Sequence, residues 1–273
     1  MGMNILVCTK FVPDPNQLQV DPATGRPDMR RTPFRINTFD ENAIEAGLRL
    51  AAEHGGRVCA VSIAPSTPPR ELLLKALAMG VDAIYLVLDE ERVVTEPLRI
   101  ATVLAAASRA MAAAEDVDGW DMVLCGEQSV DEINGQVGAR LACLLDLPCV
   151  THVTRISVDG ECATLDRAME DHGETVEAPL PVLATVGMEI NDPRMPTVLQ
   201  IMGAGRKPIK EVSLTELDGI DPQALAQSPA METLDVFSPP NVRKNIRIEG
   251  ETVAETVSGL VKRLGADGEI GVR

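Results

Sequence analysis

The strongest constraint on the fold is a regular alternation of short apolar runs with segments of helical character. Parallel strands buried on both faces are rich in β-branched and aliphatic residues, and helices connect them. We therefore expect a doubly wound α/β fold with a mostly parallel sheet. The apolar runs lie at residues 4–12, 57–65, 81–89 and 120–126, and the helical segments at 37–56, 68–80, 96–116 and 134–147.

The residues at the ends of these segments support the helical interpretation. Asp40 is the expected N-cap of the first helix, which the Gly55-Gly56 pair ends. The second helix has proline at its start and Gly80 at its end.

The pattern changes after Pro148. Residues 151–160, 161–173 and 174–187 alternate apolar and polar side chains and are separated by glycines. This alternation is typical of antiparallel strands, so we expect an antiparallel hairpin added to the edge of the sheet. A helix is expected over Pro196–Ala204, followed by a basic tail.

The chain divides into two parts in this interpretation. Residues 1–212 form the α/β domain, and residues 213–273 form a C-terminal arm that ends in a helix. The connector over 213–242 is rich in proline, and residues 250–268 have the pattern of an amphipathic helix. We expect this arm to pack on a neighbouring subunit. The alternative is a helix folded back on its own domain.

Charge and composition exclude several classes of protein. A net charge of −16 disfavours binding to nucleic acid, because an acidic surface repels phosphates. No apolar run approaches the ~20 residues that a membrane-spanning helix needs, so we expect no membrane insertion. The six cysteines are scattered without a Cys-x-x-Cys pair. They indicate small buried side chains, with no disulfide or metal site, and a cytoplasmic protein.

The loop after the fourth apolar run is the candidate ligand-binding segment. It leads into a helix whose N-terminus offers free N–H groups and a positive dipole end, both suited to a phosphate. Glycines let the backbone approach a ligand closely, and amide side chains can donate to phosphate or ribose oxygens. The small, acidic and amide residues of this loop are Gly126, Gln128, Ser129, Asp131, Asn134, Gly135, Gln136 and Gly138.

Other strand ends should meet this loop, because parallel sheets bind ligands beyond the carboxyl ends of their strands. Cys8, Asn37–Phe39 and Ser62–Pro65 would lie at this edge and form an adenine pocket, mostly from backbone groups. The alternative is a surface loop whose polar residues only cap the helix.

No set of residues indicates a catalytic centre. His54, His152 and His172 have no Ser or Cys partner in a plausible triad, and the common phosphate-loop motifs are absent. A nucleotide held without acid–base residues indicates a binding or carrier protein and not an enzyme.

Two alternatives use the same fold. An ATP-pyrophosphatase would need Ser-Gly-Gly-x-Asp-Ser after the first strand, where this chain has Cys-Thr-Lys-Phe-Val-Pro-Asp. A nucleotide-sensing module akin to universal stress proteins would need a late Gly-x2-Gly-x9-Gly-Ser/Thr motif, which the loop here does not fit.

Five stretches taken in order resemble the electron transfer flavoprotein beta-subunit family. The resemblance covers residues 4–212 and the closing arm and helix. The stretches are "ILVCTKFVPD", "INTFDENAIEAGLRL", "ALAMGVDAIYLV", "LCGEQSVDEINGQVGARLA" and the segment from "DRAMEDHGETVEAPLP" to "NDPRMPTVLQIMGAGRKPI".

The resemblance implies a heterodimer with an alpha subunit that carries the redox FAD, while this chain supplies one wall of the FAD site. It implies electron transfer from dehydrogenases, including those of fatty acid oxidation, to a redox acceptor. It also implies AMP, or a second FAD in the electron-bifurcating branch, bound to this chain. The implied dehydrogenase-docking residues are Val198, Leu199 and Met202. The implied nucleotide contacts are Cys8, Asn37, Thr38, Phe39, Asp40, Ile63, Gly126, Gln128, Ser129, Asp131, Asn134, Gly135, Gln136 and Val137.

The choice between AMP and a second FAD stays open at this point. Gln136-Val137-Gly138 is similar to the bifurcating form, but Ile133-Asn134 replaces the Asp-Thr pair that precedes it there. The Thr hydroxyl of the AMP-binding form is also absent. Pro15 stands where some members place an aromatic residue near the flavin.

Overall fold

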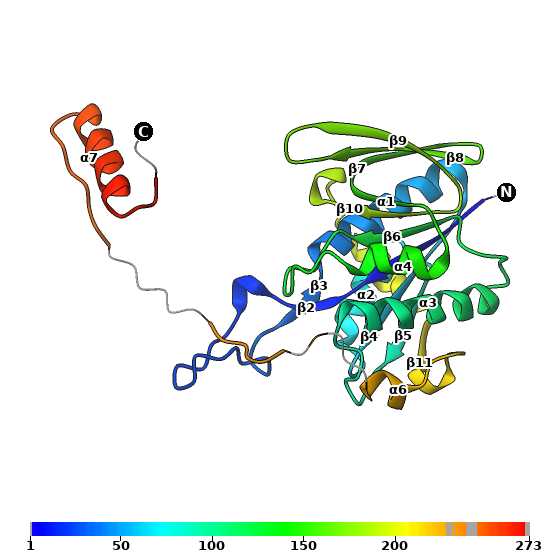
Figure 1. Cartoon of the computed structure of the whole chain (residues 1–273). Coiled ribbons are helices and arrows are strands. Elements are labelled where there is room, and N and C mark those ends of the chain that lie inside the picture. The colour runs from blue at the N-terminus through cyan, green and yellow to red at the C-terminus, as the bar shows by residue number, and fades with distance from the viewer. Residues whose placement is uncertain (1, 228–230, 232, 239–244, 271–273) are drawn as a thin grey trace.

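We describe the fold from a computed structural model, in which residues 2–227, 231, 233–238 and 245–270 are described. These residues form a nine-stranded sheet of order β11-β5-β4-β1-β6-β10-β7-β8-β9 (Figure 1). The strands from β11 to β7 pair in parallel, and β8 and β9 add antiparallel at the β7 edge. The bounds are β1 Met3–Thr9, β4 Gly56–Ala64, β5 Ala83–Leu88, β6 Met122–Gly126, β7 Cys149–Asp159, β8 Cys162–Ala168, β9 Gly173–Pro179, β10 Val182–Val186 and β11 Ile209–Ser213.

Helices cover both faces of the sheet. A small antiparallel pair, β2 (Phe11–Pro13) with β3 (Phe34–Ile36), lies outside it. The α-helices are α1 Thr38–His54, α2 Arg70–Met79, α3 Pro97–Ala114, α4 Val137–Leu145, α5 Val198–Ala204, α6 Pro222–Gln227 and α7 Val253–Ala266. The 3-10 turns are η1 Pro15–Gln17, η2 Met188–Ile190 and η3 Leu214–Glu216.

The residues of β1 explain why the sheet has an apolar core on each of its two faces. Ile5 and Val7 belong to the core that contains Ile44 of α1, whereas Leu6 belongs to the core that contains Leu104 of α3. Successive residues of a strand point to opposite faces, so an all-apolar strand supplies both cores. The predicted doubly wound, mostly parallel sheet is confirmed.

One expected antiparallel strand is instead parallel and central. The alternation over 174–187 predicts antiparallel strands throughout, and β9 fits that prediction. Residues Val182–Val186, however, form β10, which lies between β6 and β7 and runs parallel to both. All five residues of β10 are buried, and four of them are apolar, which is typical of a parallel strand covered on both faces.

The expected basic tail after α5 is also a strand. Residues Ile209–Ser213 form β11 and pair in parallel with β5. The Nζ atom of Lys210 lies 2.6 Å from the hydroxyl oxygen of Tyr85 and 2.9 Å from Oε1 of Glu115. The charged residue that makes this segment look like a tail therefore helps to fix an edge strand.

Two helix starts and three cysteines also differ from expectation. Asn37, and not Asp40, is the N-cap of α1, and Asp40 is buried in its first turn. The helix expected from Pro196 begins at Val198, because the Thr197 hydroxyl accepts a hydrogen bond from the Gln200 N–H and caps the helix. Cys8, Cys59 and Cys125 are buried as expected, but Cys143, Cys149 and Cys162 are exposed.

The C-terminal arm is described only in part, because residues 228–230, 232, 239–244 and 271–273 of the predicted 213–273 segment lie outside the described residues. Helix α7 stands apart from the helices that cover the sheet (Figure 1). None of its residues is buried, and Val253 is 81% exposed. The apolar side of this amphipathic helix is therefore exposed in this chain.

Candidate functional site

A cavity lies at the carboxyl ends of β1, β4, β5 and β6, the edge at which parallel sheets bind ligands. It has a volume of about 510 Å³, which is within the range of small-molecule sites. The strand order places β1 beside both β4 and β6, so Cys8, Ile63 and Gly126 meet although they are far apart in the chain. The loop after β6 and the start of α4 close one side.

Most of the predicted nucleotide contacts line this cavity. Thr38, Phe39 and Asp131 do not: Phe39 is buried, and Asp131 faces the Lys10 ammonium group at 2.9 Å. The predicted residues that line the cavity are Cys8, Asn37, Asp40, Ile63, Gly126, Gln128, Ser129, Asn134, Gly135, Gln136 and Val137.

The side chain of Asn37 holds the loop in place. It is 1% exposed, and its Oδ1 atom accepts a hydrogen bond from the Val130 N–H at 3.1 Å. Its amide nitrogen donates to the Gln128 carbonyl and, at 3.0 Å, to Oδ1 of Asp40. A buried polar group is costly unless it is paired, so these bonds give the loop one preferred position.

The start of α4 lies directly against the sheet because residue 138 is glycine. A Cβ atom there would be 2.4 Å from Cγ2 of Thr185 in β10, which is too close for any real side chain. The N-cap residue, Gln136, makes no side-chain cap bond. Its Oε1 atom instead accepts from Arg140 at 2.8 Å. The first N–H groups of α4 thus lack a side-chain cap beside a cavity that Gln136, Val137 and Gly138 line.

Asp40 is a buried acid in the wall of the cavity. Burial raises the pKa of Asp40 to about 7, against hydrogen bonds from the Asn37 amide and the N–H groups of Lys10 and Gly126, which lower it. The Lys10 N–H lies 2.7 Å from Oδ2. Asp40 therefore joins the end of β1 and the end of β6 to α1.

Two thiols lie side by side in the same wall. Cys8 and Cys125 are in register on adjacent strands, and both line the cavity. A hydrogen bond with Cys8, followed by burial, raises the pKa of the Cys125 thiol well above its ordinary value. A thiol with a raised pKa is a poor nucleophile, so Cys125 contributes a small side chain to this wall and not a reactive thiolate.

Comparison with known proteins identifies the family. The family model for the electron transfer flavoprotein domain matches residues 28–217. The chain is 34% identical to electron transfer flavoprotein subunit beta of Thermoanaerobacterium thermosaccharolyticum over 263 residues, which are 96% of this chain and 98% of the relative. The chain belongs to the electron transfer flavoprotein beta-subunit family.

Other members of the family match over similar lengths. Electron transfer flavoprotein subunit beta of Bacillus subtilis is 32% identical over 268 residues, 98% of this chain and 100% of the relative. Subunit CarD of the caffeyl-CoA reductase–Etf complex of Acetobacterium woodii is 36% identical over 264 residues, 96% of this chain and 98% of the relative. Proteins of this family carry electrons, which agrees with the carrier class expected from the sequence. Among the described residues, no helix is both long and apolar enough to cross a membrane.

Part of the cavity wall was not among the residues predicted from the sequence. Lys10 at the end of β1 and the segment after β5, including Asp89, Arg92 and Thr95, also line the cavity. The apolar run of β5 could have indicated this segment, because the carboxyl end of this parallel strand lies at the same edge of the sheet. Asp89 holds this segment by accepting hydrogen bonds from the N–H groups of Val93 at 3.0 Å and Val94 at 2.8 Å.

The three residues predicted to dock dehydrogenases all lie on α5. Val198, Leu199 and Met202 are exposed, and so is Met195, which precedes the helix. Leu199 is 80% and Met195 91% exposed. Exposed apolar patches on a folded chain are candidate interaction sites. We call these four residues the docking surface.

Proposed function

We propose that this chain is the beta subunit of a heterodimeric electron transfer flavoprotein and that it binds an adenine nucleotide, either AMP or a second FAD, in the cavity at the carboxyl edge of the sheet. The observation that carries the proposal is the convergence of the loop after β6, the start of α1 and the ends of β1 and β4 on this cavity. The loop after β6, the start of α1 and the end of β4 lie within residues 28–217, which the family model matches, and the end of β1 precedes that range.

The cavity residues fit a nucleotide. The uncapped first turn of α4 offers N–H groups and a positive dipole end to phosphate. Ser129, Asn134 and Gln136 offer hydrogen-bonding side chains for phosphate or ribose oxygens. Cys8 and Ile63 give apolar contact for a base. A nucleotide held here needs no acid–base partner, because it serves as a bound ligand or an electron-carrying group.

The redox FAD of the heterodimer belongs to the alpha subunit, and this chain supplies one wall of its site. FAD, when bound, accepts electrons from a dehydrogenase and releases them to an acceptor. The residues of this chain contribute by binding, orienting and excluding water. We assign no catalytic side chain, and the protein is an electron carrier and not an enzyme by itself.

The C-terminal arm, residues 213–273, packs on the alpha subunit in this proposal. Helix α7 buries none of its residues within this chain, so its apolar side chains Val257, Leu260 and Val261 are exposed. Burying such a face on a partner is favourable by about 25 cal/mol per Å² of apolar area. The α/β domain, residues 1–212, then binds the nucleotide while the arm holds the heterodimer together.

The docking surface receives the dehydrogenase. Acyl-CoA dehydrogenases of fatty acid oxidation are the partner class we propose, in the cytoplasm. An apolar surface that exposes Met195, Val198, Leu199 and Met202 suits transient contact, because methionine side chains adapt to different partners.

The test is to co-express this chain with its alpha subunit, purify the complex, denature it and count FAD and AMP per heterodimer. We expect one FAD with one AMP, or two FAD. This chain purified alone should be colourless or weakly yellow. A heterodimer without FAD would contradict the shared flavin site, and a heterodimer with one FAD and no second nucleotide would contradict the role of the cavity.

A further inference from the structure

We propose that Glu45 is a positioning residue: it fixes the segment 191–204, and with it the docking surface, to the helix whose first turn lines the nucleotide cavity. The proposal rests on the proposed function for its effect on electron transfer, but its structural claim is independent of that function.

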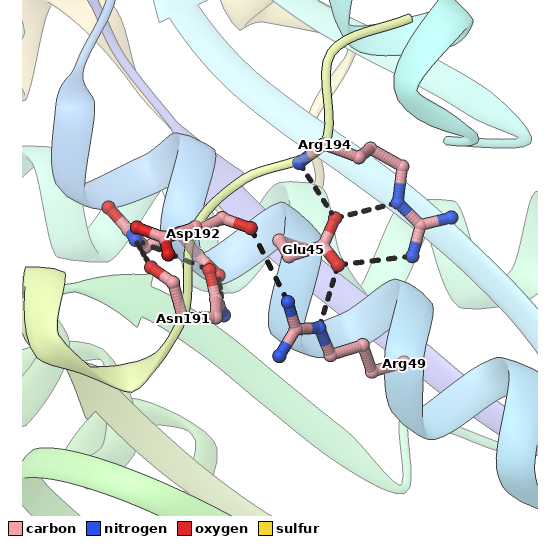
Figure 2. A network of polar contacts seen from close by, with 6 residues as sticks. Glu45, Arg49, Asn191, Asp192 and Arg194 are labelled. Carbon is pink, nitrogen blue, oxygen red and sulfur yellow. Dashed lines mark hydrogen bonds and ion pairs between the residues drawn. The ribbon is translucent and has the colours of Figure 1, made fainter.

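Glu45 is a buried carboxylate that binds two arginines (Figure 2). Its side chain is 4% exposed. Arg194 reaches both of its oxygens, with Nε 2.6 Å from Oε2 and Nη2 3.2 Å from Oε1. The Arg194 N–H donates to Oε2 at 3.2 Å, and Nε of Arg49 donates to Oε1 at 2.7 Å. A two-pronged arginine–carboxylate contact is both stronger and more directional than a single ion pair.

A second contact lies one turn earlier on the same face of α1. The side-chain amide of Asn42 donates to the backbone carbonyl of Asn191 at 2.6 Å, and the side-chain amide of Asn191 donates to the backbone carbonyl of Asn42 at 3.0 Å. Residues 42, 45 and 49 follow helical spacing, so they form a row along α1. We call Asn42, Glu45 and Arg49 the α1 clamp. It holds residues 191–194 at several points.

The docking surface begins directly after residues 191–194, the segment that the α1 clamp holds. Met195 follows Arg194 in the chain, and α5 starts three residues later at Val198. The apolar side chains of the docking surface point to solvent, so they add little to holding the segment in place. Their direction is therefore set by what lies on either side: the α1 clamp before them and the packing of α5 near α2 after them.

Helix α1 connects the nucleotide cavity with the docking surface. Asn37 and Asp40 in and before its first turn line the nucleotide cavity, and Glu45 lies further along the same helix. A hydrogen-bonded helix is a stiff element, so the docking surface keeps a fixed distance from the cavity as long as the α1 clamp holds.

The chain offers a matched control on the same helix. Glu41 is also a buried glutamate of α1 with cationic partners, Lys75 of α2 and Arg35 at 3.6 Å. None of these partners belongs to segment 191–204. Replacing Glu41 with Gln removes a comparable ion pair without touching the α1 clamp.

The experiment compares Glu45→Gln with Glu41→Gln in the purified heterodimer. Glutamine keeps the size of the side chain but loses the charge and one acceptor, so the two-pronged contact cannot form. We expect hydrogen–deuterium exchange of the amides over 195–204 to rise at least tenfold in Glu45→Gln alone. With an acyl-CoA dehydrogenase, reduced by its substrate, as electron donor, the KM for the heterodimer should rise about tenfold at nearly unchanged kcat. Flavin reduction by dithionite should not change.

Three results would overturn the proposal: unchanged exchange over 195–204 in Glu45→Gln, an equal increase in both variants, or exchange that rises throughout the chain. If exchange rises only over 195–204 but the wild type accepts no electrons from the dehydrogenase, the positioning claim stands and the proposed function fails. Should Glu45→Gln not fold, Arg194→Lys replaces it, because lysine keeps the charge but cannot make the two-pronged contact. The same exchange pattern is then required.

Discussion

The Nδ2 atom of Asn37 lies 2.9 Å from the carbonyl oxygen of Gln128, so a buried side chain at the start of α1 holds the loop that follows β6. The two residues are separated by 91 positions in the chain. The position of the candidate nucleotide loop thus depends on a helix that is distant in sequence.

Replacing Asn37 with alanine should release this loop. The partly buried carbonyl of Gln128 and N–H of Val130 would both lose a partner, at a cost of up to about 1–3 kcal/mol for each group. We expect a heterodimer with at least half of its second nucleotide lost, counted after denaturing extraction. Asn16→Ala, in the exposed turn η1 outside the cavity wall, is the control. Full nucleotide content in Asn37→Ala would contradict this role.

Gly135 should be sensitive to any side chain. Its φ of +61° is in the left-handed region, which costs other residues roughly 1–2 kcal/mol. Gly160, in the turn between β7 and β8, has a φ of +59° and open space around it. We expect Gly135→Ala and Gly160→Ala to lower thermal stability by similar amounts, but only Gly135→Ala to lower nucleotide content. Equal nucleotide content in the two variants would place the ligand elsewhere.

Stability should depend on pH through Asp40. Burial raises its pKa from 3.8 to about 7, so the folded chain holds this proton more tightly than the unfolded chain does. Its contribution to stability is complete below about pH 4 and is lost as the pH rises through 7. At ~1.4 kcal/mol per pKa unit, the loss is on the order of 4 kcal/mol.

Asparagine at position 40 cannot ionise, so the pH-dependent loss should disappear. Relative to the wild type, the free energy of unfolding of Asp40→Asn should increase between pH 5 and pH 8, as measured by urea denaturation of the full chain. A difference between the two proteins that does not change over this pH range would show that Asp40 is not the titrating group.

Charges on the docking surface should block electron transfer and spare the flavin. In Val198→Asp with Leu199→Asp, two exposed apolar side chains become acidic, and burying them against a dehydrogenase becomes unfavourable. We expect transfer from an acyl-CoA dehydrogenase to fall at least a hundredfold, whereas dithionite still reduces the flavin at the normal rate. Leu98→Asp on α3, whose side chain is also exposed, should have little effect. Normal transfer in the double variant would exclude this surface.

Helix α7 should be needed for assembly. Val257 is exposed on its apolar side, and Ser258 is exposed beside it but outside the row formed by Val253, Val257 and Leu260. We expect Val257→Asp to weaken the heterodimer at least tenfold in analytical ultracentrifugation, because an unpaired charge is costly to bury. Ser258→Asp adds the same charge and should leave assembly intact. If both variants assemble normally, the arm does not bind through this side.

The apolar runs predicted β1, β4, β5 and β6 well, because a strand buried on both faces has few ways to contain charge. They could not predict β11, in which Lys210 and Glu211 interrupt the pattern. That strand is fixed by Tyr85 and Glu115, which are 125 and 95 residues away from Lys210. No local window of sequence contains those partners.

The cavity was predictable to the extent that one rule covers it. Cys8, Ile63 and Gly126 follow from the convergence of parallel strands at their carboxyl ends. The burial of Asp40 could not be predicted from the sequence, because an acidic residue near a helix start is normally an exposed cap. Here the backbone N–H of Lys10 and the amide of Asn37 meet its carboxyl group inside the protein.

The most direct test of the central claim is a crystal structure of the heterodimer with its native ligands. We predict electron density for an adenine nucleotide between the end of β1 and the loop after β6, with phosphate oxygens within hydrogen-bonding distance of the N–H groups that begin α4. An adenine nucleotide bound elsewhere, with the loop over residues 126–137 facing only solvent, would contradict it.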